Sequence, residues 1–107
     1  MIMRLLVMFD LPTKTKVDKD HYIKFKRFLE DDGYQREQNS VYSRNLMSRA
    51  ASKSHRESLY RAKPPGGNVV AFLITEQEYV DREIIVDTRP SDSGTCKSRR
   101  EQLCLTF

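Results

Sequence analysis

Among the side chains of this sequence that could do chemistry, the Asp10 carboxylate is the best placed. It follows an apolar run, residues 2–9, and precedes Leu11 and Pro12, so it should lie where a buried strand ends in a loop. A carboxylate there could bind a hard cation such as Mg²⁺. Aspartate before such a segment is also a common turn or helix-capping residue, and the residues alone favour that second interpretation.

The other candidates for catalysis are weaker. The acidic residues between positions 18 and 32 should lie on the surface of a helix, and Glu37 is an outside candidate for assisting Asp10. The two cysteines and two histidines show none of the spacings of a zinc site. No arrangement of nucleophile, base and orienting residue is apparent. These patterns disfavour a zinc protein and a hydrolase built on a catalytic triad.

Basic side chains form a second group with possible function. The chain has 19 Lys+Arg against 15 Asp+Glu, a formal net charge of +4, which favours a polyanionic partner but also fits an ordinary soluble protein. Any single basic residue is most often part of a solvated surface, whereas a group can hold phosphates without reading bases. The candidates for such a group are Lys14, Lys16, Lys19, Arg27, Arg44, Arg49, Lys53 and Arg56.

Hydrophobic patterns predict the elements that position these side chains. Residues 2–9 and 68–75 are apolar enough for strands buried in a sheet. Apolar residues repeat with helical spacing over residues 15–32, before Gly33, and over residues 46–62, before a Pro-Pro-Gly-Gly turn. We therefore expect two strands and two amphipathic helices with one core face each.

The remaining segments are less regular. Residues 34–44 have a polar middle, which predicts an edge strand or one broken by a bulge or tight turn near Asn39. A β-prone triplet predicts a short strand over residues 83–87, and residues 89–100 read as a mobile basic loop. The alternation of residues 103–107 predicts a terminal strand.

This order of elements predicts a ferredoxin-like α+β sandwich, an antiparallel sheet covered by two helices on one face, with extra C-terminal strands. We expect residues 1–87 to form this domain, and residues 88–107 a basic loop and C-terminal strand packed at a dimer interface. The uncovered sheet face and the small core, in a chain of 107 residues, favour a homodimer. The apolar start is too short to span a bilayer, so we expect a cytoplasmic protein.

Four segments, taken in order, match a known pattern. They are residues 4–13 (RLLVMFDLPT), Tyr22 with residues 24–29 (KFKRFL), Gly33-Tyr34 followed by Gln38 and residues 40–43 (SVYS), and residues 68–77 ending ITEQ. Together they resemble the CRISPR-associated endoribonuclease family, the smaller subunit of the spacer-acquisition complex, in the form found in type II systems. The resemblance covers most of the chain up to the basic loop.

The resemblance implies a homodimer that binds Mg²⁺ through the aspartate ending the first strand, which is Asp10 here, as metal ligand and catalytic residue. It implies cleavage of phosphodiester bonds in RNA or double-stranded DNA, and spacer acquisition together with the integrase subunit. Mg²⁺ keeps several waters, so one Asp10 per protomer suffices if a two-fold axis pairs them. The metal should then bind more weakly as pH falls, because carboxylates become protonated.

Two other functions remain open at this stage. The same dimer could be a non-catalytic scaffold that binds duplex DNA and bridges the integrase, with Asp10 dispensable. A toxin-like ribonuclease of similar fold is the third possibility. The resemblance reverses the preference for a turn or capping role at Asp10, and makes the metal-dependent endonuclease the leading hypothesis.

Overall fold

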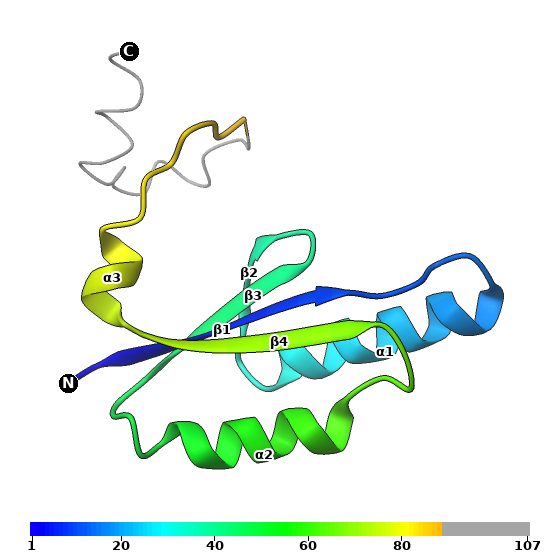
Figure 1. Cartoon of the computed structure of the whole chain (residues 1–107), viewed down its shortest axis with the longest axis horizontal. Coiled ribbons are helices and arrows are strands. Elements are labelled where there is room, and N and C mark those ends of the chain that lie inside the picture. Colours follow the sequence, from blue (N-terminus) through cyan, green and yellow to red (C-terminus); the bar gives the residue numbers. More distant parts are fainter. Residues whose placement is uncertain (89–107) are drawn as a thin grey trace. The chain divides into compact units, whose positions relative to one another are not determined.

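A four-stranded antiparallel sheet forms the framework of the computed structural model, which describes residues 1–88 (Figure 1). Its strands, in the spatial order β2-β3-β1-β4, are β1 (Met3–Asp10), β2 (Gln35–Gln38), β3 (Val41–Leu46) and β4 (Asn68–Thr75). The helices are α1 (Lys16–Asp31), α2 (Ser52–Ala62) and the short α3 (Glu76–Val80). The order of elements and strands confirms the predicted ferredoxin-like α+β fold.

The described chain divides into two compact units. Residues Met1–Glu76 form the first, which contains the whole sheet, α1 and α2, and the second starts at Gln77. The predicted division at residues 87 and 88 and its packing at a dimer interface stay predictions.

The core lies between the sheet and the two helices. On β1 the residues Met3, Leu5, Val7 and Phe9 alternate toward the helices and are at most 5% exposed, as a strand with one covered face requires. The Phe9 ring meets the edge of a phenylalanine ring of α1 and stacks on the Tyr42 ring, with centroids 5.3 and 5.8 Å apart. This packing fixes the end of β1 against α1.

The opposite face of the sheet is open in the described residues, as the prediction of two helices on one face of the sheet requires. Met8, Val70 and Phe72 are 42%, 49% and 48% exposed. Met8 lies opposite Val70 in the register, and Leu6 lies opposite Phe72, so these apolar side chains share one surface. We call Leu6, Met8, Val70 and Phe72 the open face.

The second helix begins later than predicted. It was expected from residue 46, but Leu46 belongs to β3, where it lies opposite Met3 and is 4% exposed, and α2 starts at Ser52. The error arose because Leu46 stands four residues before Ala50, a helical spacing, although both precede α2. The first helix matches its prediction and ends at Asp31, two residues before Gly33, whose φ of 94° favours glycine.

The polar segment after α1 behaves as predicted. It forms the edge strand β2, with a bulge between Arg36 and Gln38 and a turn at residues 39–40. The strand predicted over residues 83–87 is wrong, because that described stretch forms no strand and Ile85 is 79% exposed. A β-prone triplet needs a neighbouring strand to pair with. The predicted loop and strand over residues 89–107 lie outside the described residues.

Candidate functional site

Asp10 is the last residue of β1 and lies opposite Asn68, the first residue of β4. It is exposed, and it alternates along β1 with Met8, so it belongs to the same sheet face. Within residues 1–88 its carboxylate makes no hydrogen bond and no ion pair. The sequence therefore places an accessible, unpaired carboxylate at the end of a well-buried strand.

A glycine turn holds the backbone of this strand end. Gly67, which precedes β4, has φ 85°, and a Cβ atom there would lie 2.8 Å from the Asp10 carbonyl oxygen and 2.7 Å from the Leu11 Cδ2 atom. Those distances are shorter than carbon side chains tolerate, so only glycine lets the two segments approach this closely. The loop before β4 thus fixes the position of Asp10 from one side, and the packing of Phe9 fixes it from the other.

The helix-capping alternative for Asp10 is wrong. The N-cap of α1 is Thr15, whose hydroxyl oxygen accepts a hydrogen bond of 3.0 Å from the Asp18 backbone N–H. The Asp18 carboxylate accepts one of 3.3 Å from the Thr15 backbone N–H, which completes a capping box. The sequence carried this signal as Thr15 and Asp18 at the required spacing.

One protomer provides an incomplete metal site. No group of three or more His, Cys, Asp or Glu residues that could hold a metal ion occurs in the part of the chain that the structure describes. Glu37 does not join Asp10, because its carboxylate accepts hydrogen bonds of 2.6 Å from Ser43 and 3.1 Å from Gln35. An oxygen-only site for Mg²⁺ therefore fits Asp10 only if waters, a phosphate and a second carboxylate complete the shell.

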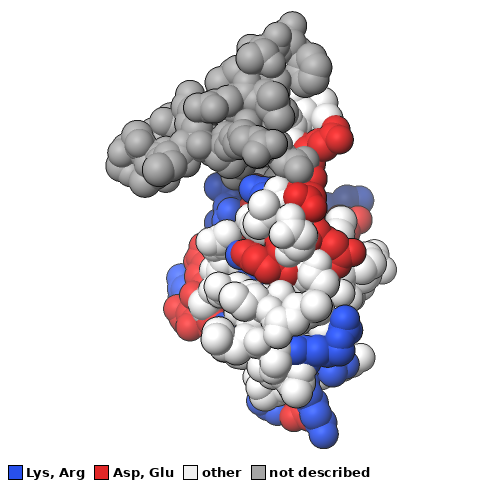
Figure 2. All heavy atoms as spheres, turned by 90° about the vertical axis from the view of Figure 1, so that its left-hand side faces the viewer, with Lys and Arg blue, Asp and Glu red and all other residues white. Residues whose placement is uncertain are grey.

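The predicted basic residues do not form one continuous surface. Lys14, Lys16, Lys19 and Arg27 are exposed on α1 and the loop before it, where the exposed Asp20 interrupts their row. Arg49, Lys53 and Arg56 are exposed at the start of α2 and along it, and we call these three residues the α2 row. Lys and Arg gather over the lower part of the surface in Figure 2, where α2 lies in Figure 1.

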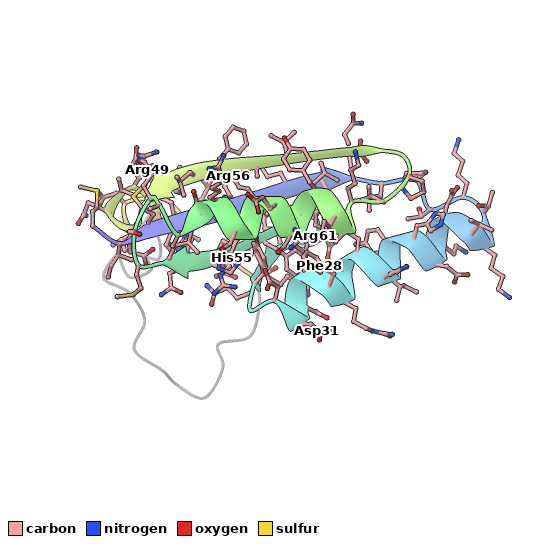
Figure 3. The ribbon with its side chains drawn as sticks, turned by 90° about the horizontal axis from the view of Figure 1, so that it is seen from below. Phe28, Asp31, Arg49, His55, Arg56 and Arg61 are labelled. Atoms are coloured by element: carbon pink, nitrogen blue, oxygen red, sulfur yellow. The ribbon has the colours of Figure 1, made fainter. Side chains whose placement is uncertain are left out.

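The α2 row lies on the side of its helix near β4. Arg49 and Arg56 point to that side in Figure 3, whereas His55 and Arg61 lie on the side toward α1. Tyr60, one helical turn after Arg56 and 74% exposed, extends the row. A surface of exposed basic side chains with an aromatic ring suits contact with phosphates.

Comparison with known proteins identifies the family. The family model for the CRISPR associated protein Cas2 matches residues 3–82, which include every strand and helix named above. The chain belongs to the Cas2 family.

The relatives agree with this assignment along most of their length. The CRISPR-associated endoribonuclease Cas2 of Acidovorax ebreus is 39% identical over 84 residues, 78% of this chain and 82% of that protein. Proteins of the same name from Lacticaseibacillus rhamnosus and Streptococcus mutans are 36% identical over 90 residues and 35% identical over 97. These alignments cover 84% and 91% of this chain, and 89% of each relative. Within residues 1–88 no helix is long and apolar enough to cross a membrane.

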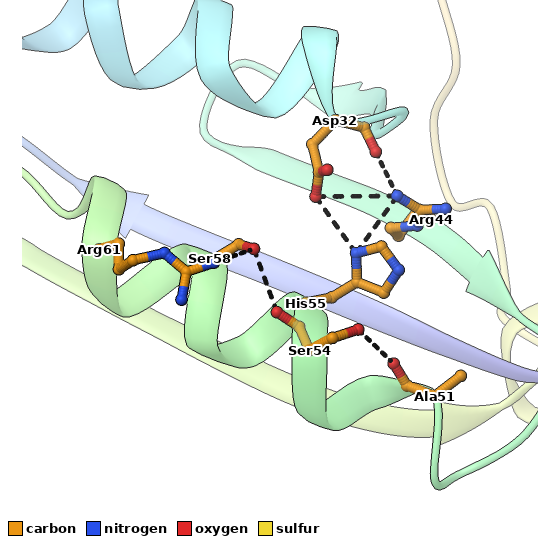
Figure 4. A network of polar contacts seen from close by, with 7 residues as sticks. All are labelled: Asp32, Arg44, Ala51, Ser54, His55, Ser58 and Arg61. Carbon is orange, nitrogen blue, oxygen red and sulfur yellow. Dashed lines mark hydrogen bonds and ion pairs between the residues drawn. The ribbon is translucent and has the colours of Figure 1, made fainter.

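One residue of the predicted basic group has a different environment in this Cas2 chain. The Arg44 guanidinium points toward the helices, donates a hydrogen bond to the Asp32 carbonyl oxygen and lies 3.7 Å from the Asp32 carboxylate (Figure 4). The His55 Nδ1 atom lies 3.3 Å from the same carboxylate. Arg44 thus connects the end of α1, β3 and α2, and we leave it out of the phosphate-binding group.

The polar network around Arg4 was not predicted from the sequence. Arg4 is 7% exposed, and its guanidinium donates hydrogen bonds of 2.8 and 2.9 Å to the two carboxylate oxygens of Glu76 and one of 2.9 Å to the Ser43 hydroxyl. A single arginine inside an apolar strand was the available signal, because a buried charge requires a partner. That partner, 72 positions later in the sequence, was not predictable from spacing.

The two buried tyrosines belong to the core. Burial raises the pKa of Tyr34, with Asp32 adding to the effect, and burial also raises the pKa of Tyr42. Both phenols therefore stay neutral, and their hydroxyl groups have no hydrogen-bond partner within the described residues. Neither side chain is accessible for stacking on a base.

Proposed function

We propose that this chain is an Mg²⁺-dependent endonuclease that cleaves phosphodiester bonds in RNA or double-stranded DNA, with Asp10 as the metal ligand and catalytic residue. The observation that carries the proposal is the exposed carboxylate of Asp10, which ends a rigid strand and has no partner in the described fold. The family membership and the shared name of the relatives, CRISPR-associated endoribonuclease Cas2, support the same reaction class.

A homodimer through the open face would complete the site. Met8, Val70 and Phe72 expose a contiguous apolar surface, which a second copy would bury with a single two-fold interface. Asp10 belongs to the same sheet face, two residues after Met8. Pairing the sheets face to face therefore brings the two Asp10 carboxylates toward each other, where they can share one ion.

Each part of the protein has a defined task in this reaction. The two Asp10 carboxylates would hold Mg²⁺, which when bound supplies an activated water and stabilises negative charge on the phosphoryl oxygens. The glycine turn at Gly67 and the packing of Phe9 keep the carboxylates in place, so little reorganisation is needed at the moment of reaction. The α2 row would hold the phosphates of the chain being cut, without preference for sequence.

The decisive experiment compares wild type with Asp10→Ala and Asp10→Asn on RNA and on duplex DNA in the presence of Mg²⁺. We expect both variants to lose cleavage by about a hundredfold or more while the dimer persists in sedimentation. Asp20→Asn is the matched control, because Asp20 is an exposed aspartate of α1, and it should cleave at the wild-type rate. Wild-type cleavage by Asp10→Ala would overturn the proposal.

The chain would act in the cytoplasm in CRISPR spacer acquisition, together with the integrase subunit. If Asp10→Ala still supports acquisition, the second candidate applies, a non-catalytic scaffold that bridges the integrase on duplex DNA. The α2 row favours that candidate specifically, because its exposed cations can bind a duplex without any metal. The two functions share the same dimer and differ in their need for Asp10.

Salt dependence tests the contribution of the α2 row to either function. The double variant Lys53→Gln with Arg56→Gln should bind duplex DNA more weakly, and its log–log salt slope should become shallower by about 0.9 for each phosphate that is no longer neutralised. The control is Lys24→Gln with Lys26→Gln, which removes the same charge from α1. An unchanged slope in the first variant would contradict a role of the row in phosphate binding.

A further inference from the structure

A pocket beside the strand end that carries Asp10 has no part in the function proposed so far. It measures about 260 Å³ and is lined by Leu11 and Pro12, by Asp18 and His21 of α1, and by residues 64–66. Most of its walls are apolar or lack a side chain, because they include three prolines and one glycine. Asp18 and His21 are the polar side chains that line it.

Two segments place this pocket next to Asp10. Leu11 and Pro12 follow Asp10 directly in the chain, and the loop of residues 64–66 leads into Gly67, whose backbone lies against the Asp10 carbonyl. The pocket is therefore a neighbour of Asp10 along the chain, but it lies against α1, whereas the Asp10 carboxylate belongs to the open face. Because the pocket touches α1, it remains accessible when the open face is covered.

The chemistry of the walls favours a nucleobase over a phosphate. The Asp18 carboxylate is negative and would repel a phosphate, whereas one of its oxygens, Oδ1, makes no hydrogen bond within residues 1–88 and can accept one. His21 makes no hydrogen bond or ion pair with a described residue. The prolines offer apolar surfaces without N–H groups, against which a planar ring can pack.

At the ring position of the cytosine amino group, a carboxylate also discriminates among bases. It accepts a hydrogen bond from an exocyclic amino group, as in cytosine, adenine or guanine, but not from the carbonyl that uracil has in the place of the cytosine amino group. A base can enter such a pocket only when it is unpaired and unstacked, as in a single-stranded segment.

We propose that the pocket of Leu11, Pro12, Asp18, His21 and residues 64–66 binds one unpaired nucleobase with an exocyclic amino group. That the base belongs to a nucleic acid substrate rests on the proposed function. Base binding itself does not require cleavage or metal. Asp18 selects the amino group, and His21 provides a second polar contact to the base or its ribose.

The test uses two short single-stranded RNAs, oligo(C) and oligo(U), which differ at the base position that the carboxylate would read. Fluorescence anisotropy in EDTA measures their binding to full-length wild type, so that no metal-dependent cleavage intervenes. We expect oligo(C) to bind about tenfold more tightly or better, the effect of one hydrogen bond to a charged group. Equal affinities would overturn the proposal.

Three variants sharpen the result. Asp18→Asn keeps an oxygen for the capping box and gains an amide donor, so its preference should shift toward oligo(U). Asp20→Asn removes the same charge from the exposed side of α1 and should keep the wild-type preference. His21→Ala should bind both RNAs severalfold more weakly. Circular dichroism confirms that each variant is folded, and an unchanged preference in folded Asp18→Asn would refute the assignment.

The outcome separates this proposal from the nuclease. A preference for oligo(C) that depends on Asp18, combined with unaltered cleavage by Asp10→Ala, would establish the base pocket and reject Asp10 as the catalytic residue. Loss of cleavage in Asp10→Ala with equal binding of both RNAs would retain the nuclease and reject the pocket.

Discussion

Arg4 and Asp10 stand on the same face of the same strand, but Arg4 is buried and paired whereas Asp10 is exposed. Arg4 is 7% exposed, with its guanidinium bonded to Glu76 and Ser43. Asp10 is exposed, and its carboxylate has no partner among residues 1–88. A charge that is paired inside the protein stabilises the fold, whereas a charge held rigidly without a partner can bind a ligand.

The largest effect on stability should come from the Arg4 end. Arg4→Ala removes the guanidinium that donates hydrogen bonds to the Glu76 carboxylate and the Ser43 hydroxyl. Little water can replace it, because the Arg4 and Glu76 side chains are only 9% and 29% exposed. We expect a loss of about 3 kcal/mol in the free energy of unfolding. Urea denaturation followed by circular dichroism measures it.

A double-mutant cycle gives the control for Arg4. Because Glu76→Gln removes the charge that Arg4 pairs with, Arg4→Ala should cost much less in that background. Equal losses in both backgrounds would show that packing of the arginine chain, and not the ion pair, stabilises this end of β1.

The next largest effect concerns the open face. Met8→Asp places an unpaired charge inside the proposed dimer interface, so we expect the dimer to dissociate more readily by about 2 kcal/mol, roughly thirtyfold in Kd. Analytical ultracentrifugation over a dilution series measures this. Ile23→Asp is the control, because Ile23 is 50% exposed on α1, away from the sheet. A Met8→Asp variant with an unchanged Kd would place the interface elsewhere.

Comparing Asp10 with Arg4 also shows which structural features the sequence could predict. Asp10 was predictable at the end of a strand because the apolar run before it is long and the Leu-Pro after it cannot continue the strand. Its lack of a capping role was not predicted, although Thr15 and Asp18 stand at the local spacing of a capping box. Local spacing therefore predicted the fold and the position of the candidate site.

Contacts between distant segments were not predictable in the same way. The pairing of Arg4 with Glu76, and of Arg44 with Asp32 and His55, depends on which strands become neighbours. The open face, in contrast, was predicted, because both helices were expected on the same side of the sheet. Which residues share it followed only from the register of β1 and β4.

A smaller effect should follow from Asp32. Asp32→Asn removes the charge that the Arg44 guanidinium and the His55 ring approach at 3.7 and 3.3 Å, but the Arg44 bond to the Asp32 carbonyl persists. Because all three side chains are partly exposed, we expect a loss of about 1 kcal/mol in the free energy of unfolding. Thermal denaturation measures it, and Asp31→Asn, an exposed neighbour, is the control. A loss as large as that in Arg4→Ala would mean that this network, too, is essential to the fold.

The smallest effect on stability should come from Asp10, although its effect on cleavage is the largest. Asp10→Asn removes no intramolecular bond within the described residues, so the free energy of unfolding without Mg²⁺ should change by less than about 0.5 kcal/mol. In the dimer the change should be stabilising, because it relieves the repulsion between two carboxylates. Urea denaturation in EDTA measures this, beside the cleavage assay on the same preparation. If Asp10→Asn instead costs as much stability as Arg4→Ala, its carboxylate has a structural partner, and the contrast between the two ends of β1 no longer identifies a ligand site.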